Sequence, residues 1–174
     1  MDRTWISIGL VVSVVAAFGL YHWVGNYAAG PFEAAKLSSR FPEKSLDYSL
    51  GDLQNLAAKA DLRKFYVVPL LFPLDLFVML ALAGSMGAAI WYWFGALGPG
   101  WALLALVPLI YLVSDLAEDG LLAWMLQPGN ASQTTITTLK TLTLIKLGSV
   151  IASAILTVVA FGLYLCRALS GNLS

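Results

Sequence analysis

Residues 101–126 read WALLALVPLIYLVSDLAEDGLLAWML, an apolar stretch that nevertheless contains three carboxylates. A helix crosses the ~30 Å hydrocarbon core of a bilayer with about 20 residues, so this stretch is long enough to span a membrane. Three further stretches of comparable length and hydropathy lie at about 5–24, 65–94 and 139–165. The sequence therefore predicts an all-α integral membrane protein, a four-transmembrane-helix bundle that forms one domain over residues 1–174.

The composition agrees with this fold class. The chain has 174 residues, 59% of them hydrophobic and 11% charged, with a mean hydropathy of +0.79. Soluble domains carry about 25% charged residues. The formal net charge of zero gives no support to a nucleic-acid partner. One cysteine and one histidine exclude an intramolecular disulfide, a Cys-cluster metal site and a haem held by two histidines of one chain.

The loop at about 25–64 is expected to contain a short amphipathic interfacial helix. Ser49 and Asp52 have the spacing of a capping box, with Asp in the reciprocal position. Leu53 and Leu56 then follow at helical spacing, with basic residues after them. This pattern predicts a helix that lies on the membrane surface and leads into the second span.

Basic residues predict the orientation of the chain. Arg3 and Arg167 lie toward one side of the predicted bundle, and the other eight lie at or near the first and third loops. Those eight are Lys36, Arg40, Lys44, Lys59, Arg63, Lys64, Lys140 and Lys146. The positive-inside rule then predicts that the first and third loops are cytoplasmic.

Four carboxylates fall inside predicted spans: Asp75 in the second, and Asp115, Glu118 and Asp119 in the third. A central charge costs about 2.5–3.5 kcal/mol on insertion scales, so such residues usually face the bundle interior. At 1.5 Å rise per residue, Asp75 lies ~15 Å from the start of its span and Asp115 ~16 Å from the end of its own. Both of those span ends face the same side, so the two residues are expected to lie level. Glu118 and Asp119 follow Asp115 on the same helical face.

Other polar groups converge on the same half of the predicted bundle. His22 ends the first span, and Lys140 and Lys146 lie in the opening turns of the fourth. Tyr66 and Tyr111 add hydroxyl groups. His22, Lys146 and Tyr111 are therefore candidate cofactor-binding residues, and His22 or Lys146 is a candidate acid–base partner of the carboxylates.

Pro69 and Pro73 lie one turn apart just before Asp75. Each proline removes an amide donor and frees a backbone carbonyl four residues earlier. The sequence leaves two interpretations open: a kink that opens a cavity beside Asp75, or a bend near the interface with no further role.

Several carboxylates close together in low dielectric cannot all stay ionised without compensating cations. Three outcomes follow from this: ion pairs with Lys146 and Lys140, a bound divalent metal such as Mg²⁺ or Mn²⁺, or partly protonated groups that relay protons. For the metal, the candidate ligands are Asp75, Asp115, Glu118 and Asp119. For catalysis, the candidates are Asp75, Asp115 and Glu118.

Threonines between Thr134 and Thr143 open the fourth span. Their hydroxyls either line a polar path or, more commonly, bond back to carbonyls of their own helix.

The middle half of the chain resembles a group of uncharacterised bacterial four-span integral membrane proteins. The resemblance rests on Tyr48-Ser-Leu-Gly-Asp52, Leu74-Asp75 in the second span, and Asp115-Leu-Ala-Glu-Asp119, where the group has a D-x-x-E-N motif. Asp119 here replaces the Asn. The resemblance implies a four-span fold and a bacterial inner-membrane location, and it implies no activity.

Three functions are consistent with the sequence. The first is an intramembrane acidic site that binds a metal, or the polar headgroup of a lipid-like or isoprenoid substrate, with membrane lipid as the partner. The second is a non-catalytic accessory subunit of a larger membrane complex. The third is a component of a proton-coupled transporter, acting as a homo-oligomer. The sequence does not decide whether the chain is an enzyme.

Overall fold

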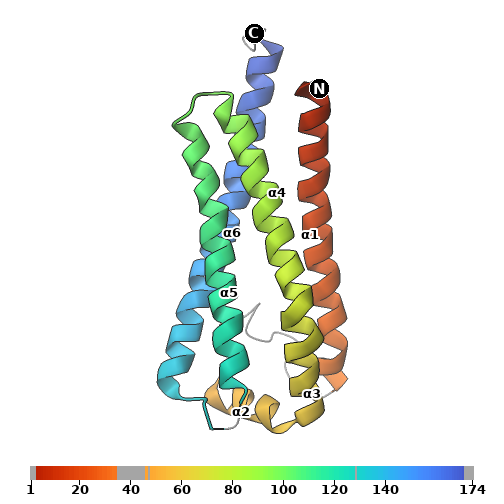
Figure 1. Cartoon of the computed structure of the whole chain (residues 1–174), viewed down its shortest axis with the longest axis vertical. Helices are drawn as coiled ribbons and strands as arrows, with labels where there is room; N and C mark the ends of the chain where they lie inside the picture. The colour runs from red at the N-terminus through yellow and green to blue at the C-terminus, as the bar shows by residue number, and fades with distance from the viewer. Residues whose placement is uncertain (1–2, 35–45, 47, 128, 171–174) are drawn as a thin grey trace.

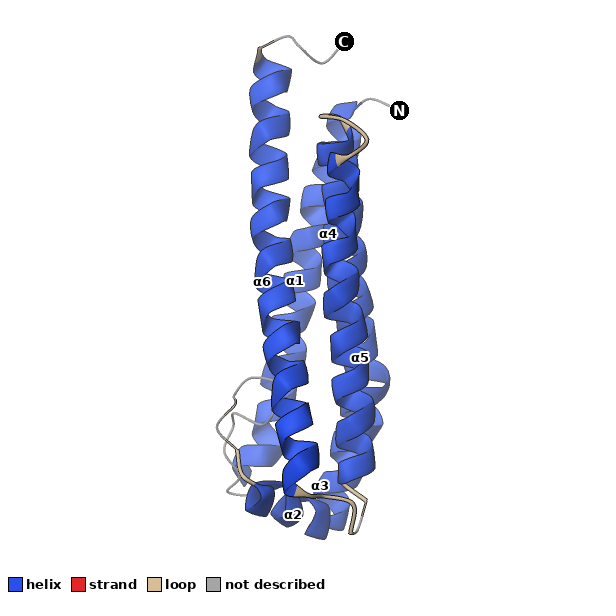
Figure 2. Cartoon of the chain, turned by 90° about the vertical axis from the view of Figure 1, so that its left-hand side faces the viewer, coloured by secondary structure: helices blue, strands red, loops and turns tan. Residues whose placement is uncertain are grey.

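The protein is described here from a computed structural model, which places residues 3–34, 46, 48–127 and 129–170. Among these residues the structure is helical, with no strand. The elements in chain order are α1 (Arg3–Ala34), α2 (Leu50–Ala58), α3 (Ala60–Phe65), η2 (Tyr66–Asp75), α4 (Leu76–Gly95), η3 (Trp101–Leu106), α5 (Val107–Met125) and α6 (Gln133–Leu169). The long helices run side by side, with both termini at one end of the bundle (Figures 1 and 2).

Four helical segments are long and apolar enough to cross a membrane, as predicted. They are Arg3–Ala29, Ala60–Gly95, Trp101–Met125 and Gln133–Leu169. The second joins α3, η2 and α4, and the third joins η3 and α5. The first and last helices extend beyond the predicted spans. Much of the predicted first loop, with Lys36, Arg40 and Lys44, lies outside the described residues.

Helix α4 holds the bundle together because it packs against α1, α5 and α6, while α5 and α6 pack closely on each other. Most of the α1 surface is exposed, including Val12 and Val15. On α6 the usual distribution of side chains is reversed. Its buried face carries Ser149, Ser153 and Thr157, and an exposed face carries large apolar side chains. Such an arrangement is expected of a helix that meets lipid rather than water.

The short helix α2 forms where predicted, and its capping box is present. The Ser49 hydroxyl accepts a hydrogen bond from the Asp52 amide, and the Asp52 carboxylate accepts one from the Ser49 amide. The apolar face of α2 is not left for the membrane, however, because Leu53 and Leu56 are fully buried.

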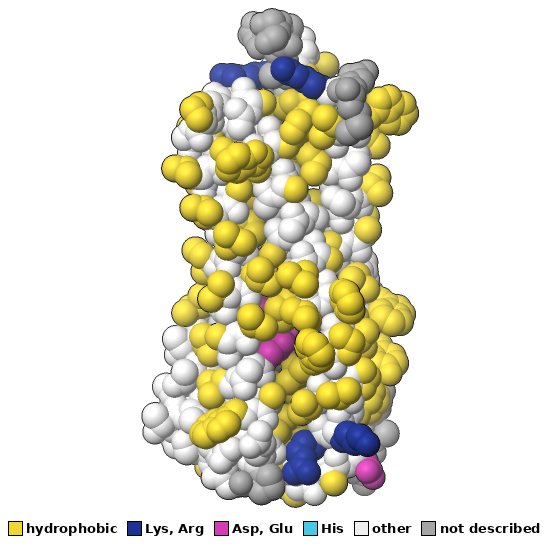
Figure 3. All heavy atoms as spheres, viewed as in Figure 1, with side chains coloured by type: hydrophobic (Ala, Val, Ile, Leu, Met, Phe, Trp, Pro, Cys, Tyr) yellow, Lys and Arg dark blue, Asp and Glu magenta, His cyan; other side chains and the backbone are white. Residues whose placement is uncertain are grey.

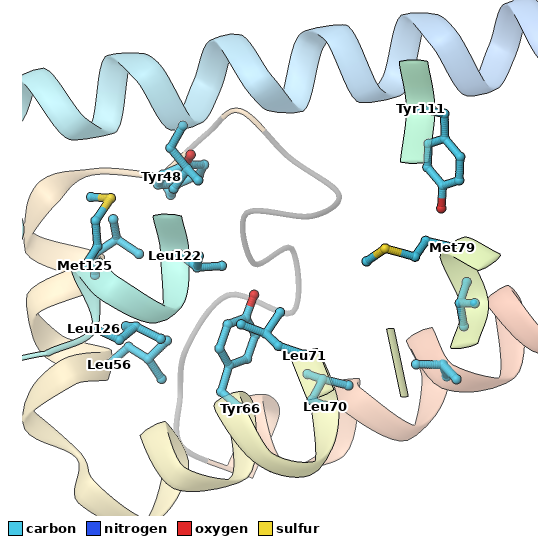
Figure 4. Close-up of a cluster of buried hydrophobic side chains, with 14 of the residues drawn as sticks. Tyr48, Leu56, Tyr66, Leu70, Leu71, Met79, Tyr111, Leu122, Met125 and Leu126 are labelled. Atoms are coloured by element: carbon cyan, nitrogen blue, oxygen red, sulfur yellow. The ribbon is translucent and has the colours of Figure 1, made fainter. Parts of the chain in front are cut away.

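These leucines belong to a cluster with side chains from the ends of α5 and α6, so α2 covers the loop-side end of the bundle. Figure 4 shows Leu56 among Leu122, Met125 and Leu126. The apolar face of α2 thus packs against the bundle, whereas its sequence pattern predicted contact with the membrane surface.

The capping box makes the stability of α2 depend on pH. Hydrogen bonds from the Ser49 amide and hydroxyl hold the pKa of Asp52 below its usual range. A carboxylate with a lowered folded pKa stabilises the fold above its unfolded pKa, and this contribution is lost as pH falls through the folded value.

We therefore expect hydrogen-exchange protection of α2 amides to fall between about pH 5 and pH 2, relative to the protection of α4. Asp52→Asn should remove this pH dependence, whereas Asp61→Asn, in the neighbouring α3, should keep it. An unchanged profile in Asp52→Asn would contradict the assignment.

Two prolines interrupt the regular helix of the second span. Val68 and Phe72, each directly before a proline, have extended backbone conformations, and the Val68–Pro69 and Phe72–Pro73 bonds are cis. Regular helix resumes at Leu76, so Asp75 is the residue at the start of α4. The break places a carboxylate next to the positive end of a 20-residue helix, where negative charge is favoured.

Candidate functional site

Two elements bring the acidic residues together. Asp75 comes from the end of η2, and Asp115, Glu118 and Asp119 share the buried face of α5 because they are three and four residues apart. One carboxylate oxygen from each of Asp75, Asp115 and Asp119 lies within 4.8 Å of the others. The predicted common level of Asp75 and Asp115 is therefore present in the structure. We call these three residues the carboxylate triad.

Lys146 of α6 lies against the same cluster. Its Nζ is 2.7 Å from Asp115 Oδ1 and 2.7 Å from Glu118 Oε2. The Thr143 hydroxyl, one turn earlier on α6, donates a hydrogen bond of 2.5 Å to Glu118 Oε1. Helix α6 thus contacts Glu118 through both Lys146 and Thr143, and it contacts Asp115 of the triad through Lys146.

The charges of this site do not balance. Glu118 is 0% and Asp115 1% exposed, and Asp75 and Asp119 retain only 8% and 7%. Among the described residues, the four carboxylates and the Lys146 ammonium would carry a formal charge of −3 if all were ionised. Figure 3 shows acidic atoms in the apolar middle of the molecular face, surrounded by hydrophobic side chains. A bound cation or proton would reduce this charge.

A cavity of about 90 Å³ lies beside the triad. Its lining includes the polar side chains of Tyr21, Asp75, Tyr111, Asp115 and Lys146, and the apolar remainder comes from α1, α4 and α6. A water molecule takes about 30 Å³, so the volume corresponds to roughly three waters. Pockets for drug-sized organic ligands usually measure about 300–1,000 Å³. The size therefore suits an ion with a few waters better than an isoprenoid or a lipid headgroup.

Most residues predicted for the site meet there. Lys146 is paired with the acids, and Tyr111 is buried and lines the cavity. In Figure 4 the rings of Tyr66 and Tyr111 both point into the bundle interior.

Two predicted residues lie elsewhere. His22 is exposed, and its Nε2 lies 3.1 Å from Asn26 Nδ2, so the structure does not bring it into the buried cluster. The Lys140 ammonium lies 5.1 Å from the centre of the Tyr48 ring, in a cation–π contact.

Sequence reasoning missed two residues near Glu118. Thr143 was treated only as part of a threonine run, although its position three residues before Lys146 places it on the same face of α6. Tyr48 precedes α2 and is buried. Burial and the charge of Glu118 raise the pKa of Tyr48 to about 12, so its hydroxyl stays protonated at neutral pH. Its motif had been noted, but nothing in the motif indicated that Tyr48 lies close enough to feel the charge of Glu118.

Other threonines of that run bond back to their own helix. The hydroxyls of Thr137, Thr138 and Thr141 donate to carbonyls four residues earlier. These side chains are exposed, so the interpretation as helix back-bonding is confirmed for them.

Comparisons with protein-family models, curated proteins and solved structures give no match to this chain.

Proposed function

We propose that this chain is an integral membrane protein that binds a divalent cation, such as Mg²⁺ or Mn²⁺, at the carboxylate triad. The observation that carries the proposal is the convergence of Asp75, Asp115 and Asp119 within 4.8 Å in a buried site. Oxygens bound to one Mg²⁺ lie about 2.1 Å from the ion, and hence about 3–4 Å from one another. Small side-chain rotations would bring the triad to that geometry.

Charge supports the same conclusion. Lys146 already pairs with Asp115 and Glu118, so a divalent cation at the triad would reduce the formal charge of the site from −3 to −1. Carboxylate oxygens are the ligands that hard cations prefer, and waters in the cavity would complete the coordination shell. In this arrangement Glu118 lies outside the triad and holds Lys146 in place.

The size of the cavity also helps to distinguish cation binding from the other candidate functions. A headgroup or isoprenoid bound within the cluster would need more volume than about 90 Å³. Proton-coupled transport would use the same carboxylates as proton acceptors, and an accessory subunit would need the cluster only for assembly. Cation binding is the function for which the structure offers both suitable ligands and a suitable space. The orientation that we propose has the first and third loops in the cytoplasm, as the basic residues predict.

Titration with Mn²⁺ tests the proposal, with free Mn²⁺ followed by electron paramagnetic resonance on purified protein in detergent. Wild type should bind one equivalent, and Asp75→Asn or Asp119→Asn should weaken binding by at least 10–100-fold, because even outer-shell changes have effects of that size. Asp119→Asn is a good first variant because it leaves the ion pairs of Lys146 with Asp115 and Glu118 in place.

Asp61→Asn, which removes an exposed acid of α3, is the matched control and should bind Mn²⁺ like wild type. Wild-type protein that binds no Mn²⁺, or triad variants that bind it normally, would contradict the proposal. Proton uptake by the cluster without Mn²⁺ binding would favour the proton-coupled function instead.

A further inference from the structure

A second polar feature lies away from the triad, at the loop-side end of the bundle. It is a groove of about 530 Å³ between α3 with the start of η2 on one side and the end of α5 on the other. Its lining includes Asp61, Arg63, Lys64, Val67, Val68 and Ala123. The carboxylates of the triad take no part in it.

The groove is basic at one end and apolar along its walls. Arg63 and Lys64 form the last turn of α3, and Asp61 is the one acid of the lining, so the formal charge of the lining is +1. Figure 3 shows Lys and Arg side chains at the lower end of the bundle, with hydrophobic side chains directly above them. The groove therefore offers positive charge next to an apolar surface.

The position of this charge along the second span matters. Arg63 and Lys64 lie near the start of the membrane-length segment Ala60–Gly95, where a bilayer has its phosphate groups. Val68 and Phe72 follow, and they are 56% and 60% exposed. A molecule that fits this sequence of surfaces carries an anionic group at the interface and an apolar chain that runs toward the membrane interior.

We propose that the groove binds an anionic phospholipid, with its phosphate at Arg63 and Lys64 and the upper part of an acyl chain against Val67, Val68 and Ala123. The net positive lining complements a headgroup whose net charge is negative, whereas the ammonium group of a zwitterionic lipid offsets its phosphodiester charge. A volume of about 530 Å³ lies within the usual range for small-molecule sites. The inference shares with the proposed function the placement of the bundle in a membrane, and it does not depend on the cation site.

Native mass spectrometry of the full chain in detergent tests this inference, with phosphatidylglycerol and phosphatidylcholine of identical acyl chains as the probes. Wild type should retain phosphatidylglycerol preferentially. A basic residue near an anionic headgroup contributes about fivefold in affinity, so Arg63→Gln/Lys64→Gln should lower retention by roughly 25-fold. Equal retention of the two lipids by wild type would overturn the proposal.

Arg167→Gln is the matched control at the opposite end of the bundle. Arg167 donates a hydrogen bond of 3.3 Å to the Ala96 carbonyl, much as Arg63 donates one of 3.2 Å to the Ala57 carbonyl. The control should leave phosphatidylglycerol retention unchanged. Asp61→Asn removes the negative charge of the lining and should increase retention, which keeps the proposal testable if the double variant fails to fold.

Two further measurements test whether the acyl chain contributes to binding and whether the groove is independent of the triad. Inorganic phosphate that binds as tightly as phosphatidylglycerol would overturn the acyl-chain part of the proposal. Mn²⁺ binding should be unaffected by Arg63→Gln/Lys64→Gln. Loss of lipid preference with intact Mn²⁺ binding supports the groove as a separate site, whereas failure of Mn²⁺ binding alone would count against the triad and not against the groove.

Discussion

Lys146→Met is expected to destabilise the protein by about 3–5 kcal/mol in the presence of a chelator. Lys146 is 6% exposed and lies 2.7 Å from both Asp115 and Glu118. Removing one partner of a buried ion pair leaves the other charge uncompensated, and the cost is typically of this size. Equilibrium unfolding in mixed detergent micelles, followed by tryptophan fluorescence, measures the change in the free energy of unfolding.

Two companion measurements connect this variant to the site. Millimolar Mg²⁺ or Mn²⁺ should restore part of the lost stability, because a divalent cation can replace the missing positive charge. The triple variant Lys146→Met/Asp115→Asn/Glu118→Gln should also regain stability, since the acids that need Lys146 are neutralised. A loss below about 1 kcal/mol in Lys146→Met would contradict this account of the two ion pairs.

Leu56→Ala is expected to cost about 2–5 kcal/mol of unfolding free energy, the range for a buried leucine replaced by alanine. Leu56 is fully buried where α2 covers the end of the bundle. Leu103, which is 63% exposed in η3, provides the control, and Leu103→Ala should cost less than about 1 kcal/mol. The same unfolding assay applies to both variants. Equal small effects would place α2 on the membrane surface, as the sequence alone suggested.

The four long helices and the meeting of the acids follow from elementary helix geometry. Hydropathy and length determine the spans, and the rise per residue places Asp75 and Asp115 at one level. The spacing of three and four residues then keeps Glu118 and Asp119 on the same face. These inferences needed only local rules, which is why the structure agrees with them.

Other features depend on which surfaces meet, and a single sequence does not specify this. An apolar stripe such as that of α2 has the same pattern whether lipid or protein covers it. Lys140 and Lys146 are almost two turns apart, yet only the rotation of α6 decides that Lys146 meets the acids while Lys140 meets Tyr48. The rotation of α1 about its own axis likewise places His22 on the exposed face of that helix. The length of the break in the second span was also not evident from Pro69 and Pro73 alone.

The two proposed sites differ in chemistry and in position along the second span. The triad begins at Asp75, after the proline break, and the groove begins at Arg63, before it. The intervening segment η2 is irregular, with Val68 and Phe72 extended. A cation in the bundle interior and an anionic lipid at its edge would therefore occupy opposite ends of the same irregular segment.

The metal content of the protein, gently extracted from its native membrane and analysed by native mass spectrometry with elemental analysis of the same sample, tests the central claim most directly. The account predicts close to one divalent cation per chain in wild type, its loss in Asp119→Asn, and its retention in Asp61→Asn. A metal-free wild-type chain, or a chain whose metal content is the same in Asp119→Asn, would contradict it.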